Sequence, residues 1–178
     1  MSGGLIQLVA YGAQDVYLTG NPQITFFKVV YRRHTNFAVE AIEQTFNSSP
    51  DFGKKAQCQI ARNGDLMTKV YLEVTLSSFD VTGTPGAALA WAPRVGYNMI
   101  NSVELEIGGT TIDKHYADWM NIWYELSHEV GQERGFGKMV GNDPAYTTLA
   151  ASMNAVQLFV PLQFFHCRHD GLALPLIA

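Results

Sequence analysis

The stretch QITFFKVVYRRH, residues 23–34, organises the chain. Successive residues of a strand point to opposite faces, and here both faces are apolar at the start, whereas Lys28, Arg32 and Arg33 mark where one face meets solvent or a neighbour. The pattern predicts a long strand that is covered on both sides. Gly20, Asn21 and Pro22 just before it are typical of a turn. We therefore expect residues 1–22 to form an N-terminal arm and residues 23–178 to form one domain.

Composition supports a single domain with much apolar surface. The chain has 178 residues, of which 16% are charged and 12% aromatic, whereas an ordinary soluble chain has about 25% charged residues. Two interpretations are compatible: a well-filled β core, or surface that is buried against other chains. The net charge of −4 and the lack of a basic stripe argue against direct nucleic-acid binding. No apolar run is long enough for a transmembrane segment.

Two hairpins are predicted from strict alternation around glycine turns. Residues 56–61 and 66–76 flank Asn63-Gly64, a pair suited to a type I′ turn, and the second of these strands alternates Leu72, Val74 and Leu76 with polar residues. Residues 102–107 and 110–113 flank Gly108-Gly109 in the same way. Val103, Leu105 and Ile107 are expected to face inward.

The remaining segments complete a mainly β pattern. Residues 37–46 resemble a strand with a bend near 40–42, and residues 77–98 and 131–155 are predicted to be long loops. Apolar residues at spacings of three and four predict a helix over 116–128, which Gly131 would end. Residues 156–165 predict a strand covered on both faces, with Pro161 marking a sheet edge or a bulge. Short strands, tight turns and one inserted helix favour an all-β, antiparallel jelly-roll sandwich.

Few residues suggest chemistry. His166, Cys167 and His169 could share a metal ion, with Cys58 as a further ligand, but a zinc site needs converging ligands, and a polar strand end with a buried thiol is the simpler interpretation. Cys58 and Cys167 are expected to be reduced thiols. Cys167 beside His166 and His169 could suggest a nucleophile with its base, but adjacency in sequence does not establish that geometry, and no phosphate-binding loop motif occurs. We therefore expect no catalytic, cofactor-binding or metal-binding residues, and no enzyme activity.

Three further features allow alternative interpretations. Trp119 and Trp123 on the predicted helix are most simply core residues, although they could touch a neighbouring subunit. Asn47 begins an Asn-Ser-Ser sequon, which would matter in a secreted chain. Exposed Trp91 could stack on a sugar in a jelly-roll carbohydrate-binding module, and a metal-dependent jelly-roll enzyme is another possibility.

Several segments resemble, in order, the major capsid proteins of large icosahedral double-stranded DNA viruses of the iridovirus and phycodnavirus type. These segments are residues 3–37 (GGLIQLVAYGAQDVYLTGNPQITFFKVVYRRHTNF), 62–76 (RNGDLMTKVYLEVTL), 100–113 (INSVELEIGGTTID), the aromatic helix near YADWMNIWYEL, and 160–178 (VPLQFFHCRHDGLALPLIA). Together they span nearly the whole chain.

The resemblance implies a structural role in the virion. It implies a double jelly-roll protein that forms homotrimers, pseudo-hexagonal capsomers that tile an icosahedral shell, and assembly in the host cytoplasm. Residues 1–22 would contact neighbouring capsomers or minor capsid proteins. Because such proteins are more than twice as long, we expect this chain to be most of the first jelly roll, ending before its last strands.

Overall fold

The computed structural model describes residues 34–177. The chain divides into two units, residues 1–42 and residues 43–178, which are described separately. In the first unit, residues 34–42 form neither helix nor strand and are exposed. The strand predicted over 37–46 is therefore wrong, because without a neighbouring ladder an extended segment is not held as a strand; Phe46 makes a single bridge to Cys58. The predicted arm, 1–22, and nearly all of the predicted strand 23–34 lie outside the described residues.

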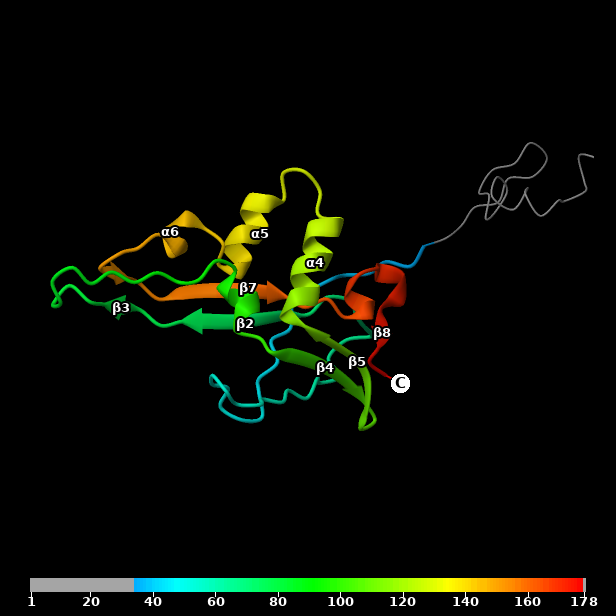
Figure 1. The fold of residues 1–178 in the computed structure, drawn as a ribbon. Helices are drawn as coiled ribbons and strands as arrows, with labels where there is room; N and C mark the ends of the chain where they lie inside the picture. Colours follow the sequence, from blue (N-terminus) through cyan, green and yellow to red (C-terminus); the bar gives the residue numbers. More distant parts are fainter. Residues whose placement is uncertain (1–33, 178) are drawn as a thin grey trace, which may run out of the picture. The chain divides into compact units, whose positions relative to one another are not determined.

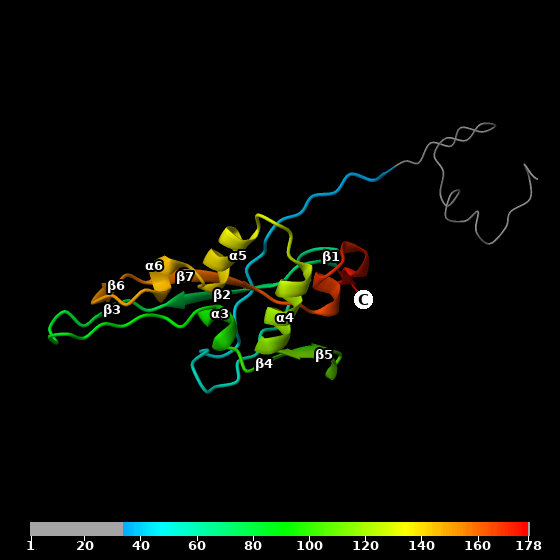
Figure 2. The same cartoon turned by 45° about the horizontal axis from the view of Figure 1, so that its top comes forward.

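The described part of the second unit is built from short strands, α-helices and two 3₁₀ turns (Figure 1). In chain order they are β1 (Leu66–Met67), β2 (Tyr71–Leu76), β3 (Phe79–Asp80), α3 (Val95–Asn98), β4 (Ser102–Ile107), β5 (Thr110–Tyr116), α4 (Ala117–Ser127), α5 (Glu133–Val140), α6 (Pro144–Thr147), β6 (Ser152–Met153), β7 (Val156–Pro161), η1 (Phe165–Cys167), η2 (Asp170–Leu172) and β8 (Leu174–Pro175). Figures 1 and 2 place β3, β6 and α6 at one end of this unit and β1, β8 and the β4–β5 hairpin toward the other.

The core is built on the antiparallel pair β2–β7. Its register sets Leu72 opposite Val160, Val74 opposite Leu158, and Leu76 opposite Val156. Because side chains alternate along each strand, all six point to the same face, which α3 and α5 contact. The buried residues gather here: Leu76, Val95, Tyr97, Met120, Val140, Val156, Leu158, Val160, Leu162 and Phe164.

Two glycines allow the helices to approach β7 closely. A Cβ on Gly96 in α3 would lie 2.7 Å from Val160 Cγ2, and one on Gly141 after α5 would lie 2.6 Å from Val95 Cγ1. Both distances are shorter than a carbon–carbon contact of about 3.5–4.0 Å. A larger residue at Gly96 would therefore push α3 away from β7, and one at Gly141 would push the end of α5 away from α3.

The predicted hairpin at 102–113 is confirmed. Strands β4 and β5 pair from Ser102–Tyr116 to Ile107–Thr110, and the turn residues Gly108 and Gly109 have φ of 60° and 81°, as a type I′ turn requires. The register shifts between Leu105 and Glu106. Ile107, predicted to face inward, is 49% exposed, because the tip of the hairpin extends beyond the buried core (Figure 1).

The predicted hairpin around Asn63-Gly64 is wrong. Neither residue has the positive φ that a type I′ turn needs. Residues 56–61 form no strand, β1 pairs with β8, and β2 pairs with β7. The alternation of Leu72, Val74 and Leu76 inward is correct, but the partner is about eighty residues further along the chain.

One of the observed helices was predicted from the sequence, and the others were not. Helix α4, Ala117–Ser127, confirms the helix predicted over 116–128 to within one residue at each end. The predicted loop 131–155 instead contains α5, α6 and β6, and the predicted loop 77–98 contains β3 and α3. Gly135 and Gly137 lower the helix propensity of α5, but burial of Gly137 and Val140 in the fold compensates. The side chain of Asp143 caps α6 by accepting a hydrogen bond from the Ala145 N–H at 2.9 Å.

The strand pairs in residues 34–177 are all antiparallel, as predicted, and form four two-stranded sheets. The prediction of a single inserted helix is wrong, because this range contains four α-helices. Strand β7 is covered on one face instead of two, since Phe159 on its other face is 42% exposed. It ends at Pro161, and its one ladder partner within the described residues is β2; the predicted edge or bulge at Pro161 stays a prediction. None of the described helices is long and apolar enough to cross a membrane.

Candidate functional site

The residues considered as metal ligands are dispersed. His166 in η1 is 1% exposed and packs against the rings of Phe164 and Phe165 at centroid distances of 5.8 and 5.4 Å. His169 is exposed, and its Nδ1 accepts a hydrogen bond from the Gly171 N–H at 2.9 Å. Cys58 lies on an extended segment opposite Phe46. Across residues 34–177, no three or more His, Cys, Asp or Glu side chains come together as a metal site would need.

Cys167 is a half-buried thiol rather than a reactive one. It packs against the core, and burial raises the pKa of its thiol. Because the thiolate is the nucleophile, a raised pKa lowers its reactivity at neutral pH. Both cysteines are free thiols.

Trp91 lies in a small apolar depression. The depression has a volume of about 210 Å³ and is lined by Ser77, Phe79, Leu89, Ala90 and Trp91. The indole of Trp91 packs against the core, and its Nε1–H is buried with no acceptor among the described residues. A sugar-binding platform presents an open ring face with polar groups beside it, whereas here the surroundings offer one hydroxyl. The arrangement suits apolar contact better than carbohydrate stacking.

The apolar residues of α4 divide between the core and the surface. Met120 is fully buried, whereas Trp119 and Trp123 are partly exposed, with their ring centroids 5.9 Å apart. The guanidinium of Arg168, between η1 and η2, lies 5.7 and 5.3 Å from these two rings, within the range of a cation–π interaction. This contact joins α4 to the segment that follows β7.

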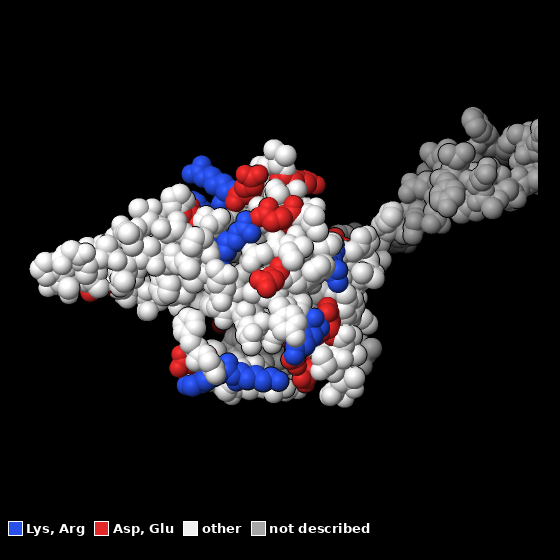
Figure 3. Space-filling model, viewed as in Figure 1, with Lys and Arg blue, Asp and Glu red and all other residues white. Residues whose placement is uncertain are grey.

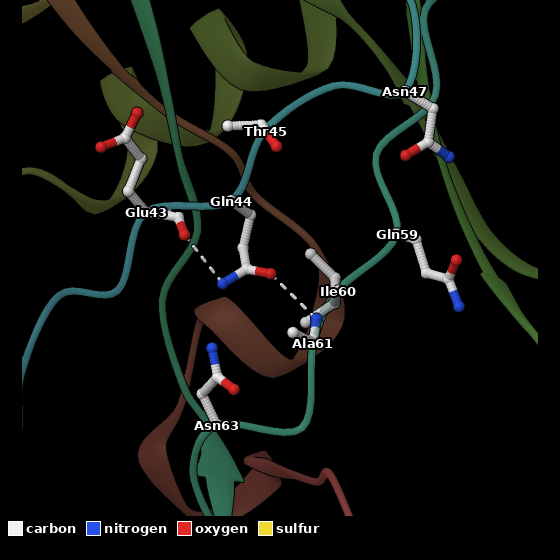
Figure 4. A pocket seen from close by; sticks show the side chains of 8 residues that line it. All are labelled: Glu43, Gln44, Thr45, Asn47, Gln59, Ile60, Ala61 and Asn63. Carbon is white, nitrogen blue, oxygen red and sulfur yellow. Dashed lines mark hydrogen bonds between the residues drawn. The ribbon is translucent and has the colours of Figure 1, made fainter.

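A second hollow lies between residues 43–47 and 59–63. It has a volume of about 490 Å³, and Figure 4 shows the side chain of Gln44 reaching across it. Gln44 Oε1 accepts a hydrogen bond from the Ala61 N–H at 2.9 Å, and Gln44 Nε2 donates to the Glu43 carbonyl at 2.9 Å. Among its lining residues, Glu43 is the single ionisable one. Asn47, the sequon residue, lies exposed at its edge, and its backbone N–H donates to the Gln57 carbonyl.

The surface itself is the most distinctive feature. In the second unit, more large apolar side chains are exposed than buried. Three of the exposed residues come from separate parts of the unit: Leu126 of α4 at 78%, Leu149 after α6 at 69%, and Ile112 of β5 at 52%. In Figure 3, charged side chains cluster over the helices and hairpin, while the end that carries β3 and β6 is almost free of charge on the visible face. Surfaces of this kind are typical of proteins that bury them against other chains.

Comparisons with known proteins identify the family. A family model described as the major capsid protein N-terminus matches residues 25–178. The major capsid protein of Pyramimonas orientalis virus is 58% identical over 180 residues, which cover 100% of this chain and 44% of that protein. The major capsid protein of Paramecium bursaria Chlorella virus 1 is 49% identical over 178 residues, which cover 100% of this chain and 38% of that protein.

Solved structures agree. A quasi-atomic model of the PBCV-1 virus capsid superposes with a TM-score of 0.65 at 40% identity and covers 86% of this chain and 35% of that chain. The chain thus spans less than half the length of the relatives it matches. The family model, the relatives and the fold all agree, and the chain belongs to the family of viral major capsid proteins, whose N-terminal part it matches.

Proposed function

We propose that this chain is the wall-forming N-terminal part of a major capsid protein subunit, and that it adopts the first jelly roll of a double jelly-roll protein. Membership in a family of structural capsid proteins supports the role. The observation that carries it is the apolar surface: more large side chains are exposed than a core of this size buries. A shell subunit covers such surface with its neighbours.

The partners in this proposal are copies of the same protein. The subunits form homotrimers, the trimers act as pseudo-hexagonal capsomers, and the capsomers tile an icosahedral shell of the virion. Low charge and many aromatic residues support large apolar contacts between subunits. No catalytic, cofactor or metal role belongs to the proposal.

The domain division and the further partners are also part of the proposal. Residues 1–22 act as an arm that contacts neighbouring capsomers or minor capsid proteins, and residues 23–178 form the jelly-roll domain. Assembly takes place in the host cytoplasm. The resemblance of residues 3–37 to capsid proteins supports the arm, and the family match over 25–178 supports the domain.

The oligomeric state tests this function directly. Light scattering of the full-length subunit, of which this chain is proposed to be the N-terminal part, is expected to give the mass of a trimer at micromolar concentration. A monomer across that concentration range would contradict the proposal, because the proposal explains the exposed apolar surface by contacts between subunits.

Surface variants connect the trimer to the exposed apolar residues. The test variant replaces three exposed apolar residues with serine: Ile112→Ser, Leu126→Ser and Leu149→Ser. The matched control changes an exposed polar neighbour of each one: Thr111→Ala, Ser127→Ala and Thr148→Ala. Each apolar side chain that is fully buried in a contact contributes about 1.5–3 kcal/mol, roughly ten- to a hundredfold in affinity. The test variant is expected to dissociate and the control to remain trimeric; equal dissociation of both would contradict an apolar interface.

A further inference from the structure

Two buried histidines flank one phenylalanine where β5 meets the segment after β7. The ring of His115 lies edge-on to Phe164 at a centroid distance of 4.7 Å, and the ring of His166 lies nearly parallel to Phe164 at 5.8 Å. His115 is 4% exposed and His166 is 1% exposed. The three residues form a cluster, here called the histidine cluster, that joins β5 to η1.

The imidazole nitrogens of this cluster are unusual. None of the four ring nitrogens of His115 and His166 has a hydrogen-bond partner among the described residues. Most buried polar side-chain atoms do have a partner, and a neutral imidazole carries one donor and one acceptor. Within the described part of the chain, both rings are therefore held by apolar and aromatic contacts. A proton added to either ring would place a positive charge in that apolar contact.

The charged and titratable groups around the cluster are few. Asp113, two residues before His115 on the same face of β5, accepts a hydrogen bond from the Phe165 N–H at 2.9 Å. Arg168 follows η1 and lies over the Trp119 and Trp123 rings, and the half-buried Cys167 thiol follows His166. Burial lowers the pKa of both imidazoles; Asp113 offsets part of this, and Arg168 lowers the pKa of His115 further.

We propose that the histidine cluster is an acid-sensitive latch, which packs β5 against the segment 162–167 at neutral pH and loosens that contact when His115 and His166 are protonated. The inference concerns the fold of this chain and does not depend on shell assembly. In a shell, a fall in pH would then destabilise the fold of each subunit.

The sign and size of the effect follow from proton linkage. A histidine whose pKa is lowered by folding stabilises the fold above its ordinary pKa of 6.5, and this contribution is lost progressively as the pH falls from 6.5 toward the lower value. Between pH 7.5 and 5.5, an exposed imidazole of pKa 6.5 gains its proton while the buried one stays neutral. The equilibrium constant for opening therefore rises up to about tenfold for each histidine and about a hundredfold for both.

The test compares denaturant unfolding at pH 7.5 and pH 5.5, above the range where carboxylates titrate. The equilibrium constant for unfolding of the wild-type protein is expected to rise by up to about a hundredfold between pH 7.5 and pH 5.5. His115→Phe and His166→Phe each keep an aromatic ring without a titrating group and should reduce the rise to about tenfold, and the double variant should abolish it. His169→Phe, which alters an exposed ring, is the matched control and should behave as wild type.

Two outcomes would overturn the proposal. One is a double variant that loses as much stability between pH 7.5 and 5.5 as the wild type does. The second comes from the wild-type protein itself, which keeps the test valid if a variant fails to fold. An NMR titration of the His115 and His166 rings is expected to give pKa values below 6.5 for both, and values at or above 6.5 would contradict a latch that is held by neutral imidazoles.

Discussion

The close approach of α3 to β7 predicts that one methyl group destabilises this protein. Gly96 is buried in α3, and in Gly96→Ala the new Cβ would lie 2.7 Å from Val160 Cγ2, 3.0 Å from the Val140 carbonyl oxygen and 3.3 Å from Val140 Cα. Two of these neighbours are backbone atoms of α5, and the third belongs to a β-branched side chain with one strongly preferred rotamer. None of the three can move aside easily.

The expected magnitude combines two opposing effects. Overpacking of a well-filled core costs about 1–3 kcal/mol. Replacing glycine by alanine inside a helix stabilises by up to about 1 kcal/mol, and α3 is a short helix of four residues, so the gain is at the low end. The net result is a loss of about 1–2 kcal/mol in the free energy of unfolding. For a chain of this size, that lowers the Tm by roughly 2–8 °C.

The assay is denaturant unfolding of Gly96→Ala beside Gly135→Ala. Gly135 lies in α5, and a Cβ there would meet no atom within 4 Å. The same chemical change in a second helix should therefore stabilise by up to about 1 kcal/mol. If Gly96→Ala is as stable as the wild type, then α3 does not pack against β7 and α5 as described.

Other consequences of the fold can be tested in the same way. Leu158→Ala removes a fully buried side chain of β7 and should cost about 2–5 kcal/mol in unfolding free energy, whereas Leu149→Ala at an exposed position should cost less than about 0.5 kcal/mol; equal losses would contradict the assigned core. Gly109→Ala forces alanine to a φ of 81° and should cost about 1–2 kcal/mol. Gly64→Ala, at a position without positive φ, should leave the free energy of unfolding unchanged. A loss of stability as large as that of Gly109→Ala would instead support the type I′ turn predicted at Asn63-Gly64. Cys167, with its raised thiol pKa, should react with iodoacetamide at pH 7.5 far more slowly in the folded protein than in denaturant, as mass spectrometry of Cys167-containing peptides would report; equal rates would show that the thiol is not protected.

Local patterns predicted those elements whose partners lie nearby in the sequence. The β4–β5 hairpin has its turn, its two strands and its register within residues 102–116, so alternation and the Gly108-Gly109 pair were sufficient. Helix α4 has a strong spacing of apolar residues, and Met120 on that stripe is fully buried. By contrast, the Asn63-Gly64 pair had the right residue types for a turn, but β2 pairs with β7, about eighty residues further along the chain, a partner that local alternation could not reveal.

The candidate residues show the same division. Sequence reasoning singled out His166 for its neighbours Cys167 and His169, but alternation along the segment and the turn at η1 separate their side chains. It missed His115, because the hairpin strand that carries it has no pattern to distinguish a buried histidine from an exposed one. A possible signal was its position opposite Val103, an inward residue of β4.

The amino-acid sequence by itself determined the antiparallel β character, the second hairpin, the aromatic helix and, through its resemblance, the capsid protein family. Tertiary structure alone decided that β2 pairs with β7, that glycine-containing segments become α3 and α5, and that His115 meets His166 around Phe164. The physical reason is the separation along the chain of the residues that interact. Turn conformation and side-chain periodicity act between residues close in the chain, whereas strand pairing, the close approach of a helix and burial depend on which distant surfaces fit together.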